Sequence, residues 1–326
     1  MSRFTQAAAT MHTLSLAAME EASRFGVHDA DIDHLLLALT IDADTGGQVL
    51  RRAGIRLDAT RAAVAAQHAG QLLAMGIDAP AVGPGRIVFH ETDGYDWTER
   101  ALAVLRAASQ GGRRGDSAAV LRALLAEPSG LIAAILARLA VTEDDLTAQL
   151  DEVEGTARSP QPGEERAAGG ITGSRSMFVP AAETEVRAVL ADPERLPEWE
   201  QSVATVLPAG DDGPWEAFAP TTTPDGRPLH RKPEFHRLHV TQEKERSGAV
   251  TWRFEYPDAP QANPRVLTMA LEPAAGGTQL RATMTWETRP RGPVRRALRA
   301  PLLPLWRGLV FIQLAQVESG ISRIFR

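Results

Sequence analysis

The spacing of apolar residues changes along the chain after Gly173. Before that residue, apolar stretches such as Leu35–Leu39 are separated by polar loops and Gly-containing turns, which is typical of packed helices. After it, apolar and polar residues alternate, and the last apolar segment, Leu305–Phe325, returns to a helical period. The pattern therefore predicts a helical half, followed by a half that combines strands with a long final helix.

The helical pattern occurs twice in the first half. The first copy contains Met19–Leu39, and a second, more degenerate copy runs from Trp97 through Val120–Leu124 to Leu139. Each copy predicts a helix, a polar loop, an apolar helix, a Gly-containing turn and a further apolar helix. Self-similarity of this kind indicates a helical repeat, so residues 1–150 are predicted to form one all-α domain.

Three alternating runs in the second half predict strands. Their apolar positions are Trp252, Phe254 and Tyr256; Leu267, Met269 and Leu271; and Leu280, Ala282, Met284 and Trp286. Period-two alternation places these side chains on one face, as in an antiparallel sheet with a single covered face. Before the runs, Ser174–Val179 predicts a strand, Ala181–Leu190 a helix and Pro193–Trp199 a short helical turn. With Leu305–Phe325 as the covering helix, residues 172–326 are predicted to form an α+β domain.

Between the halves, residues 151–171 concentrate Pro, Gly and charged residues and show no apolar periodicity. Such a composition is typical of a flexible linker. The predicted organisation is therefore a helical domain at 1–150, a linker at 151–171 and an α+β domain at 172–326.

The composition is that of a soluble globular protein, with 44% hydrophobic and 23% charged residues in a chain of 326. A net charge of -6 and a pI near 5.8 argue against nucleic acid as a partner, because phosphate binding needs a basic surface. The absence of cysteine excludes disulfides, thiol catalysis and Cys-based metal sites. It also fits a reducing cytoplasm, where we expect the protein to be located. Neither a secretory signal nor a bilayer-spanning segment is apparent.

The two helical copies share residues with a known repeat family. The matching positions are Gly26, Asp33–Leu39 and Gly54–Ile55 in the first copy, and Trp97, Thr98 and Ala101 in the second. Residues 1–150 therefore resemble the Clp amino-terminal (Clp repeat) domain, the substrate- and adaptor-docking cap of the Clp unfoldases. The resemblance implies docking of a protein partner, either the Clp protease machinery or its substrates, through Asp33, His34 and Thr98. Ala118 and Ala119 replace the corresponding acid and histidine in the second copy.

The chain lacks the ATPase module that follows this cap in the unfoldases. No Gly-x-x-x-x-Gly-Lys-Ser/Thr phosphate-binding sequence occurs, and the two lysines, Lys232 and Lys244, lie outside Gly-rich loops. A docking domain without a motor indicates an adaptor, a decoy or a sensor.

The second half matches another family over nearly its whole length. The matching segments are Val179–Ala181 before the first helix, Ala191–Trp199 after it, and the final helix. This half resembles the START-like (SRPBCC) superfamily of polyketide cyclases and lipid-transport proteins. The resemblance implies a helix-grip fold, in which an antiparallel sheet and a long C-terminal helix enclose a cavity. Because members include enzymes, carriers and receptors, the fold alone does not fix the activity.

Large apolar and aromatic side chains on the inner face of such a sheet suit a hydrophobic ligand. The residues expected to line the cavity are Trp252, Phe254, Tyr256, Met269, Met284 and Trp286 from the strands and Trp306 from the helix, with Phe311 and Ile312 as further candidates. The alternative is that these residues simply fill a core.

The histidines and acids form no strong catalytic or metal motif. His236 and His239 are three residues apart, so they face opposite sides of a strand and cannot bind one ion together. The one that faces inward would act as a general base or a ligand anchor, and we include His236 among the ligand-binding residues. The run Asp29–His34 fits either a metal site or, as we favour, a solvated loop and helix N-terminus. We therefore predict no metal and no cofactor.

A basic cluster in this acidic protein contains Arg295, Arg296 and Arg299. Either these residues lie on a solvated helix end, or they make a transient membrane-surface contact with anionic lipid headgroups during ligand exchange.

The favoured interpretation is a non-motor, two-domain protein that binds a lipid or polyketide-like molecule in one domain and a protein partner through the other. The alternative is a polyketide cyclase/aromatase-like enzyme, with a cyclase or dehydratase activity and an accessory helical domain. An enzyme needs an acid-base pair that points into the cavity, whereas a carrier needs only an apolar cavity. A third interpretation, two filled domains that serve only as interaction surfaces, stays open.

Overall fold

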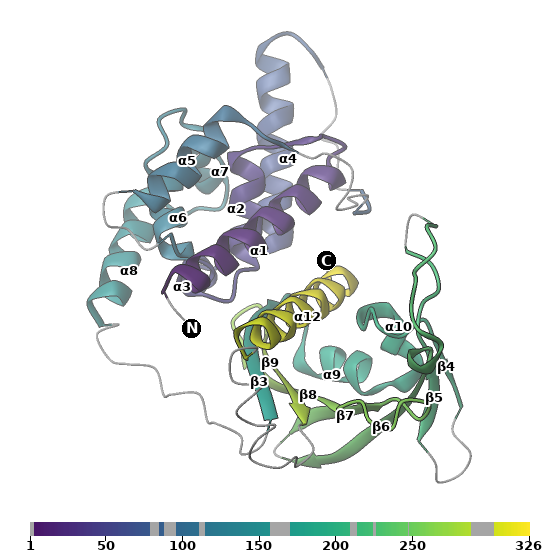
Figure 1. Ribbon diagram of the computed structural model, residues 1–326. Helices are drawn as coiled ribbons and strands as arrows, with labels where there is room; N and C mark the ends of the chain where they lie inside the picture. The colour runs from purple at the N-terminus through teal and green to yellow at the C-terminus, as the bar shows by residue number, and fades with distance from the viewer. Residues whose placement is uncertain are drawn as a thin grey trace. The chain divides into compact units, whose positions relative to one another are not determined.

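The computed structural model describes residues 3–78, 85–87, 96–110, 115–156, 170–208, 214–223, 226–246, 248–287 and 303–326. The chain divides into two compact units, Met1–Pro162 and Gly163–Arg326 (Figure 1). The described chain is helical up to Thr156 and is a strand from Gly170, so regular structure extends into both ends of the segment predicted as a linker.

The N-terminal unit is helical, as predicted. Its helices are α1 (Arg3–Arg24), α2 (Ile32–Thr40), α3 (Thr45–Arg52), α4 (Leu57–Ala74), α5 (Glu99–Ser109), α6 (Ser117–Leu125), α7 (Leu131–Arg138) and α8 (Glu143–Thr156). Two short strands pair in parallel: β1 (Asp29–Ala30), which precedes α2 in the chain, and β2 (Asp96–Trp97), which precedes α5.

The helices α5–α8 follow the same order as α1–α4 and repeat some of their local geometry. The third helix of each set ends at a residue with positive φ, which is 80° at Gly54 after α3 and 57° at Ala140 after α7. The N–H of the following residue then donates back into the helix, from Ile55 to the carbonyl of Leu50 and from Val141 to that of Leu136. This is the bond of a Schellman helix end, and its recurrence shows that the two sets close their third helices alike.

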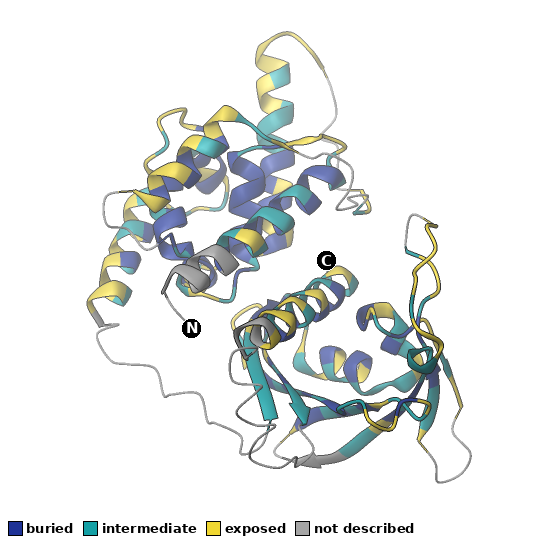
Figure 2. Ribbon diagram, in the orientation of Figure 1, coloured by how far each residue is buried: buried dark blue, intermediate teal, exposed yellow. Residues whose placement is uncertain are grey.

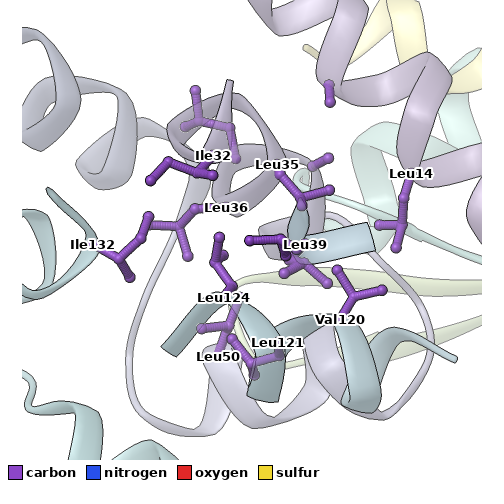
Figure 3. Packing of buried hydrophobic residues seen from close by; sticks show 14 of the residues in the cluster. Leu14, Ile32, Leu35, Leu36, Leu39, Leu50, Val120, Leu121, Leu124 and Ile132 are labelled. Carbon is purple, nitrogen blue, oxygen red and sulfur yellow. The ribbon is translucent and has the colours of Figure 1, made fainter. Parts of the chain in front are cut away.

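The core of the N-terminal unit is built around α2. Every residue from Ile32 to Thr40 is buried, as expected for a helix that is apolar nearly all round. Figure 3 shows the packing of the apolar cluster around this helix, in which the labelled side chains are Leu14, Ile32, Leu35, Leu36, Leu39, Leu50, Val120, Leu121, Leu124 and Ile132. The apolar stretch Leu35–Leu39 therefore lies at the centre of the fold, where its side chains serve packing.

The C-terminal unit is an antiparallel sheet with helices on one face, and it fits the helix-grip fold that the sequence predicts (Figure 1). Its elements are β3 (Gly170–Val179), α9 (Glu183–Ala191), the 3-10 helix η1 (Pro193–Arg195), α10 (Leu196–Trp199), β4 (Thr205–Leu207), β5 (Trp215–Phe218), the 3-10 helix η2 (Pro233–Phe235), β6 (Arg237–Arg246), β7 (Ala249–Glu255), β8 (Arg265–Ala274), β9 (Gly277–Glu287) and α12 (Leu303–Ile324). In the described chain the seven strands lie in the order β3-β9-β8-β7-β6-β5-β4.

The inner face of this sheet, the face covered by α9, α10 and α12, is apolar. Along β8, burial alternates as the sequence predicts, and α12 adds Val310, Leu314, Val317 and Ile321 to the same core. Two glycines allow the helix to approach its neighbours closely. A Cβ at Gly173 would lie 2.8 Å from Val310 Cγ1, and one at Gly320 would lie 2.3 Å from the carbonyl oxygen of Trp199. Figure 2 shows that both units contain buried residues along their helices and strands.

Candidate functional site

A charged residue occupies a buried, inward-facing position at the start of β8. Arg265 begins β8 in phase with Leu267 and Met269, and only 8% of its surface is exposed. It pairs with Phe254 on β7 and with Trp286 on β9, so Arg265 lies between two aromatic residues in one row across the sheet. A buried charge is costly unless it is paired, and the partners of Arg265 therefore define a candidate site.

The partners of Arg265 come from the segment that follows α10. Its Nη1 donates to Oε1 of Glu200 at 3.3 Å, and its Nη2 donates to Oγ of Ser202 at 2.9 Å. The guanidinium carbon also lies 4.2 Å from the centroid of the Phe254 ring, as in a cation–π contact. We call these four residues, Arg265, Glu200, Ser202 and Phe254, the Arg265 cluster.

The Asp-Pro-x-x-Leu-Pro-x-Trp segment places Glu200 against Arg265. Asp192 accepts the N–H of Glu194 at 2.9 Å and thereby begins η1. The four-residue α10 then ends as the N–H of Glu200 donates to the carbonyl of Leu196 at 2.8 Å. Trp199 is buried, with its carbonyl close to Gly320 of α12, and the next residue, Glu200, is 3% exposed.

One carboxylate oxygen of Glu200 has no hydrogen-bond partner in the described chain. Oε1 accepts three hydrogen bonds, from Arg265 and from both N–H and Oγ of Ser202. Oε2 is buried and has no hydrogen-bond partner among the described residues, and the same holds for the indole Nε1 of Trp199. The nearby Trp252 differs, since its indole N–H donates to the carbonyl of Leu190 at 2.8 Å. Buried polar atoms are normally satisfied, so Glu200 and Trp199 present one acceptor and one donor for which a ligand is a natural partner.

Two aromatic pairs lie near the end of the sheet that contains the Arg265 cluster. Trp286 packs edge-on against Trp306 of α12 with ring centroids 5.5 Å apart, and Phe235 packs similarly against Tyr256 at 5.1 Å. Trp306 is 36% exposed, so the Trp286–Trp306 pair reaches solvent.

The structure brings most of the predicted ligand-binding residues to the inner face, at different depths. Trp252, Phe254, Met269 and Met284 are buried in the core, whereas Tyr256 and Trp286 are half-buried at its margin. His236 ends η2 instead of lying in a strand, and its Nε2 lies 3.2 Å from the carbonyl oxygen of Arg231.

One helix residue was assigned to the wrong face, since Ile312 is 53% exposed. Phe311 lies at the edge of the sheet, where its ring centroid is 5.0 Å from the guanidinium carbon of Arg175 on β3. The inward stripe of α12 is instead the one that begins at Val310. The error arose because nearly every position from Leu305 to Ile312 is apolar, which leaves the helical phase ambiguous.

A pocket of about 350 Å³ lies elsewhere in this unit, between η1 and the β4–β5 edge of the sheet. It is lined by Pro193, Glu194, Val206, Pro208 and Trp215. Trp215 connects it to the core, since its ring packs edge-on against Trp252 at 5.8 Å. Neither this pocket nor the roles of Glu200, Ser202 and Arg265 were predicted.

The residues that the Clp resemblance assigns to docking are engaged inside the N-terminal unit. Asp33 is 2% exposed and its Oδ2 lies 2.9 Å from Nε2 of His68. Burial acts to raise the pKa of Asp33, but hydrogen bonds and charge from His34 and His68 outweigh it and hold the pKa well below its usual range. The hydrogen bond to Asp33 in turn raises the pKa of His68, against the opposing effect of burial.

Thr98 and His34 act as helix caps. Thr98 accepts the N–H of Ala101 at 3.2 Å and donates to Oδ1 of Asp31 at 2.6 Å, which links the two helical sets. His34 accepts the N–H of Asp31 at 3.1 Å in a capping box. A partner at this surface would meet the half-exposed imidazole of His68 before the side chain of Asp33. Within the described residues, the acids and histidines form no group with metal-binding geometry.

Two further observations concern membranes. The cluster of Arg295, Arg296 and Arg299 lies outside the described residues. None of the helices in the described part of the chain combines the length and apolar character needed to cross a bilayer.

Residues 171–316 match a family described as polyketide cyclase / dehydrase and lipid transport. This match supports a polyketide cyclase-like domain in the C-terminal unit, and the antiparallel sheet with its closing helix fits a helix-grip fold. None of the curated proteins matches the chain. The Clp resemblance of the N-terminal unit finds no support in these comparisons and stays a prediction.

Several solved structures are similar to part of the chain. The di-domain ARO/CYC StfQ from the steffimycin biosynthetic pathway is 18% identical, with 58% of this chain and 59% of that chain covered at a TM-score of 0.35. A START superfamily protein from Mycobacterium smegmatis is 13% identical, with coverages of 48% and 99% and a TM-score of 0.33. TTHA0849 from Thermus thermophilus is 19% identical, with coverages of 47% and 96% and a TM-score of 0.30. The chain spans 59% of the length of StfQ, and no conclusion about function follows from these similarities.

Proposed function

We propose that the C-terminal domain binds a hydrophobic small molecule, a lipid or polyketide-like compound, against the inner face of its sheet. The observation that carries this proposal is the Arg265 cluster. A buried ion pair is weak evidence for stability, because apolar residues of similar volume are often as stable or more so. A buried guanidinium and carboxylate at the end of apolar rows are better explained as the polar end of a ligand site.

The neighbouring residues suit the apolar part of such a ligand. Trp286 and Tyr256 are half-buried beside the cluster, and Met284 continues the inner face one row deeper. Methionine adapts to ligands of irregular shape, and aromatic rings offer large contact areas. The ligand would enter at the strand ends near Trp306 and direct its polar group toward Glu200.

Titration with N-phenyl-1-naphthylamine, a neutral apolar dye that fluoresces when it leaves water, tests this proposal. We expect saturable binding by the full chain and a weaker affinity for Met269→Trp, which fills inner-face volume without adding charge. Ala270→Trp is the matched control, because Ala270 follows on the same strand but faces away from the core. The proposal fails if the wild-type chain binds no dye and Met269→Trp loses about 1–3 kcal/mol of stability, as an overpacked core would.

A second candidate is a cyclase or dehydratase, favoured by the acid–cation pair of Glu200 and Arg265 on the inner face. A positioned carboxylate acts as a general base when it reaches the proton it removes. Native mass spectrometry of the purified protein separates the two functions. A co-purifying molecule that keeps its mass on incubation supports binding, whereas a molecule that loses water in the wild type but not in Glu200→Gln supports the enzyme.

We propose a protein contact for the N-terminal domain, in an adaptor, decoy or sensor role. The support is its resemblance to the Clp cap, its helical fold and the lack of a nucleotide-binding sequence. Size-exclusion chromatography of the full chain with purified Clp unfoldase and protease tests this role. Co-elution that His68→Gln weakens supports it, because His68 is the half-exposed group over Asp33, and separate elution at micromolar concentrations contradicts it.

A further inference from the structure

We infer that the ligand presents a neutral hydroxyl group to the Arg265 cluster, and that Glu200 selects hydroxylated apolar molecules against carboxylates. This inference rests on the proposed binding function and concerns which ligands the site selects. The observation behind it is Oε2 of Glu200, a hydrogen-bond acceptor that is buried and has no partner among the described residues. An O–H group is the smallest neutral donor that an apolar molecule can bring to it.

The charge of Arg265 is already compensated, which argues against an anionic ligand. Its guanidinium donates to Glu200 and Ser202 and lies over the ring of Phe254. A ligand carboxylate that approached would meet the second oxygen of Glu200, and two like charges repel strongly where water is excluded. An isolated arginine would favour a fatty acid, whereas an arginine paired with a buried glutamate does not.

A ligand oxygen could also accept a hydrogen bond from the indole N–H of Trp199. Nε1 of Trp199 is a buried donor without a partner in the described chain, in the residue next to Glu200. Alcohols and phenols contain both a donor O–H and an acceptor oxygen. An unsubstituted hydrocarbon would leave Glu200 Oε2 unsatisfied in the complex, and a site built around a buried polar group discriminates against ligands that cannot pair it.

Substitution of Glu200 by glutamine has a predictable orientation. Arg265 and Ser202 supply three donors to the Oε1 position, so they would hold the amide oxygen of the new side chain there. The amide NH₂ would then occupy the Oε2 position. Glu200→Gln therefore converts the open acceptor into a donor at nearly constant shape.

Three small probes test the inference with the full-length protein: naphthalene, 2-naphthol and 2-naphthoate, titrated calorimetrically at about pH 7. In the wild type, 2-naphthol should bind about tenfold more tightly than naphthalene, the value of one hydrogen bond to a charged group, and 2-naphthoate should bind weakest. In Glu200→Gln, the advantage of 2-naphthol should shrink toward that of naphthalene, and the affinity for 2-naphthoate should rise. Glu198→Gln is the matched control, because Glu198 lies two residues away in an exposed pair with Arg195 and should leave the ranking unchanged.

The outcomes separate this inference from the proposed function. If none of the three probes binds the wild type, the proposed function fails and the inference fails with it. If naphthalene binds but 2-naphthoate binds as tightly as 2-naphthol, the domain has an apolar site and Glu200 does not select the ligand. The wild-type ranking decides this without the variant, so an unstable Glu200→Gln would not rescue the inference.

Discussion

Ala140 has a Cβ at a helix end where the equivalent residue of the first helical set is a glycine. Its φ is 57°, and the left-handed region costs a residue with a side chain roughly 1–2 kcal/mol. We expect Ala140→Gly to stabilise the N-terminal unit by about 0.5–1 kcal/mol, since relief of strain outweighs the added freedom of the unfolded chain. Urea denaturation measures the change. The reciprocal variant is Gly54→Ala, where φ is 80° and no atom lies within 4 Å of the new Cβ, so a loss of stability there would isolate the backbone effect.

His68 should make the stability of the N-terminal unit depend on pH. Its hydrogen bond to Asp33 raises the pKa of His68 in the folded state, so the protonated form stabilises the fold. That contribution is complete below the unfolded pKa of about 6.5 and is lost as the pH rises through the higher folded value. The melting temperature of the wild type relative to His68→Gln should therefore fall as the pH rises from below about 6.5 through the higher pKa of the folded state. A constant difference between the two proteins would show that the Asp33–His68 pair carries no linkage.

Asp42 is a second pH-sensitive residue, and the comparison with His68→Gln removes its effect. Burial, with the charge of Asp44, raises the pKa of Asp42 to about 7. A raised carboxyl pKa destabilises the fold progressively as the pH rises from about 4 to 7. Because both proteins contain Asp42, this effect cancels in their difference.

Neither Arg265 nor Glu200 was predicted, although the sequence contains a signal for the burial of Arg265 and none for that of Glu200. Arg265 occupies the inward phase of the run that continues through Leu267, Met269 and Leu271, so its burial follows from the alternation. A charged residue in that phase is a signal for a polar group in an apolar interior. Glu200 follows a four-residue helix and lies in no periodic run, and its partner Arg265 on β8 is remote in sequence.

At the scale of elements, the contact between α10 and α12 connects the fold to the site. A Cβ at Gly320 would lie 2.3 Å from the carbonyl oxygen of Trp199, so Gly320→Ala must push α12 away from α10. We expect a loss of about 1–3 kcal/mol, as for other overpacked contacts. Dye binding should also weaken, because Trp199 precedes Glu200. Gly308→Ala on the same helix is the control: no atom lies within 4 Å of its Cβ, and alanine favours helix by up to about 1 kcal/mol. Equal effects of the two substitutions would contradict this account of the contact.

Long elements were predicted well, and short or polar ones were missed. The three alternating runs correspond to β7, β8 and β9, and the final apolar segment to α12. Strands of two to four residues, such as β1 and β4, contain too few alternations to be recognised. The ten-residue β6 was missed for another reason. Its inward phase passes from Leu238 and Val240 to Gln242, whose amide donates to the carbonyl of Ala191, so the apolar alternation stops after two positions.

At the scale of the whole molecule, each unit has its own hydrophobic core. One buried cluster contains only residues between Leu14 and Leu150, and the other contains only residues between Met177 and Ile321. The Pro-, Gly- and charge-rich composition of residues 157–169 favours proteolytic cleavage between them. We therefore expect limited trypsin and Glu-C digestion to release two fragments that stay folded. First cuts inside 3–156 or 170–326 would show that the division of the chain into two independent domains is wrong.

If the cores are independent, a buried charge in one should leave the other intact. Met284 is fully buried in the C-terminal core, and Met284→Arg would place an unpaired cation there at a cost of several kcal/mol. Calorimetry should then show one melting transition lowered or lost and the other unchanged, and dye binding should disappear. Val120→Arg, in the core of the N-terminal unit, should affect the opposite transition and spare dye binding. A single transition lowered by both substitutions would instead mean that the units unfold together, and that a ligand in the C-terminal domain can influence the N-terminal domain through shared stability.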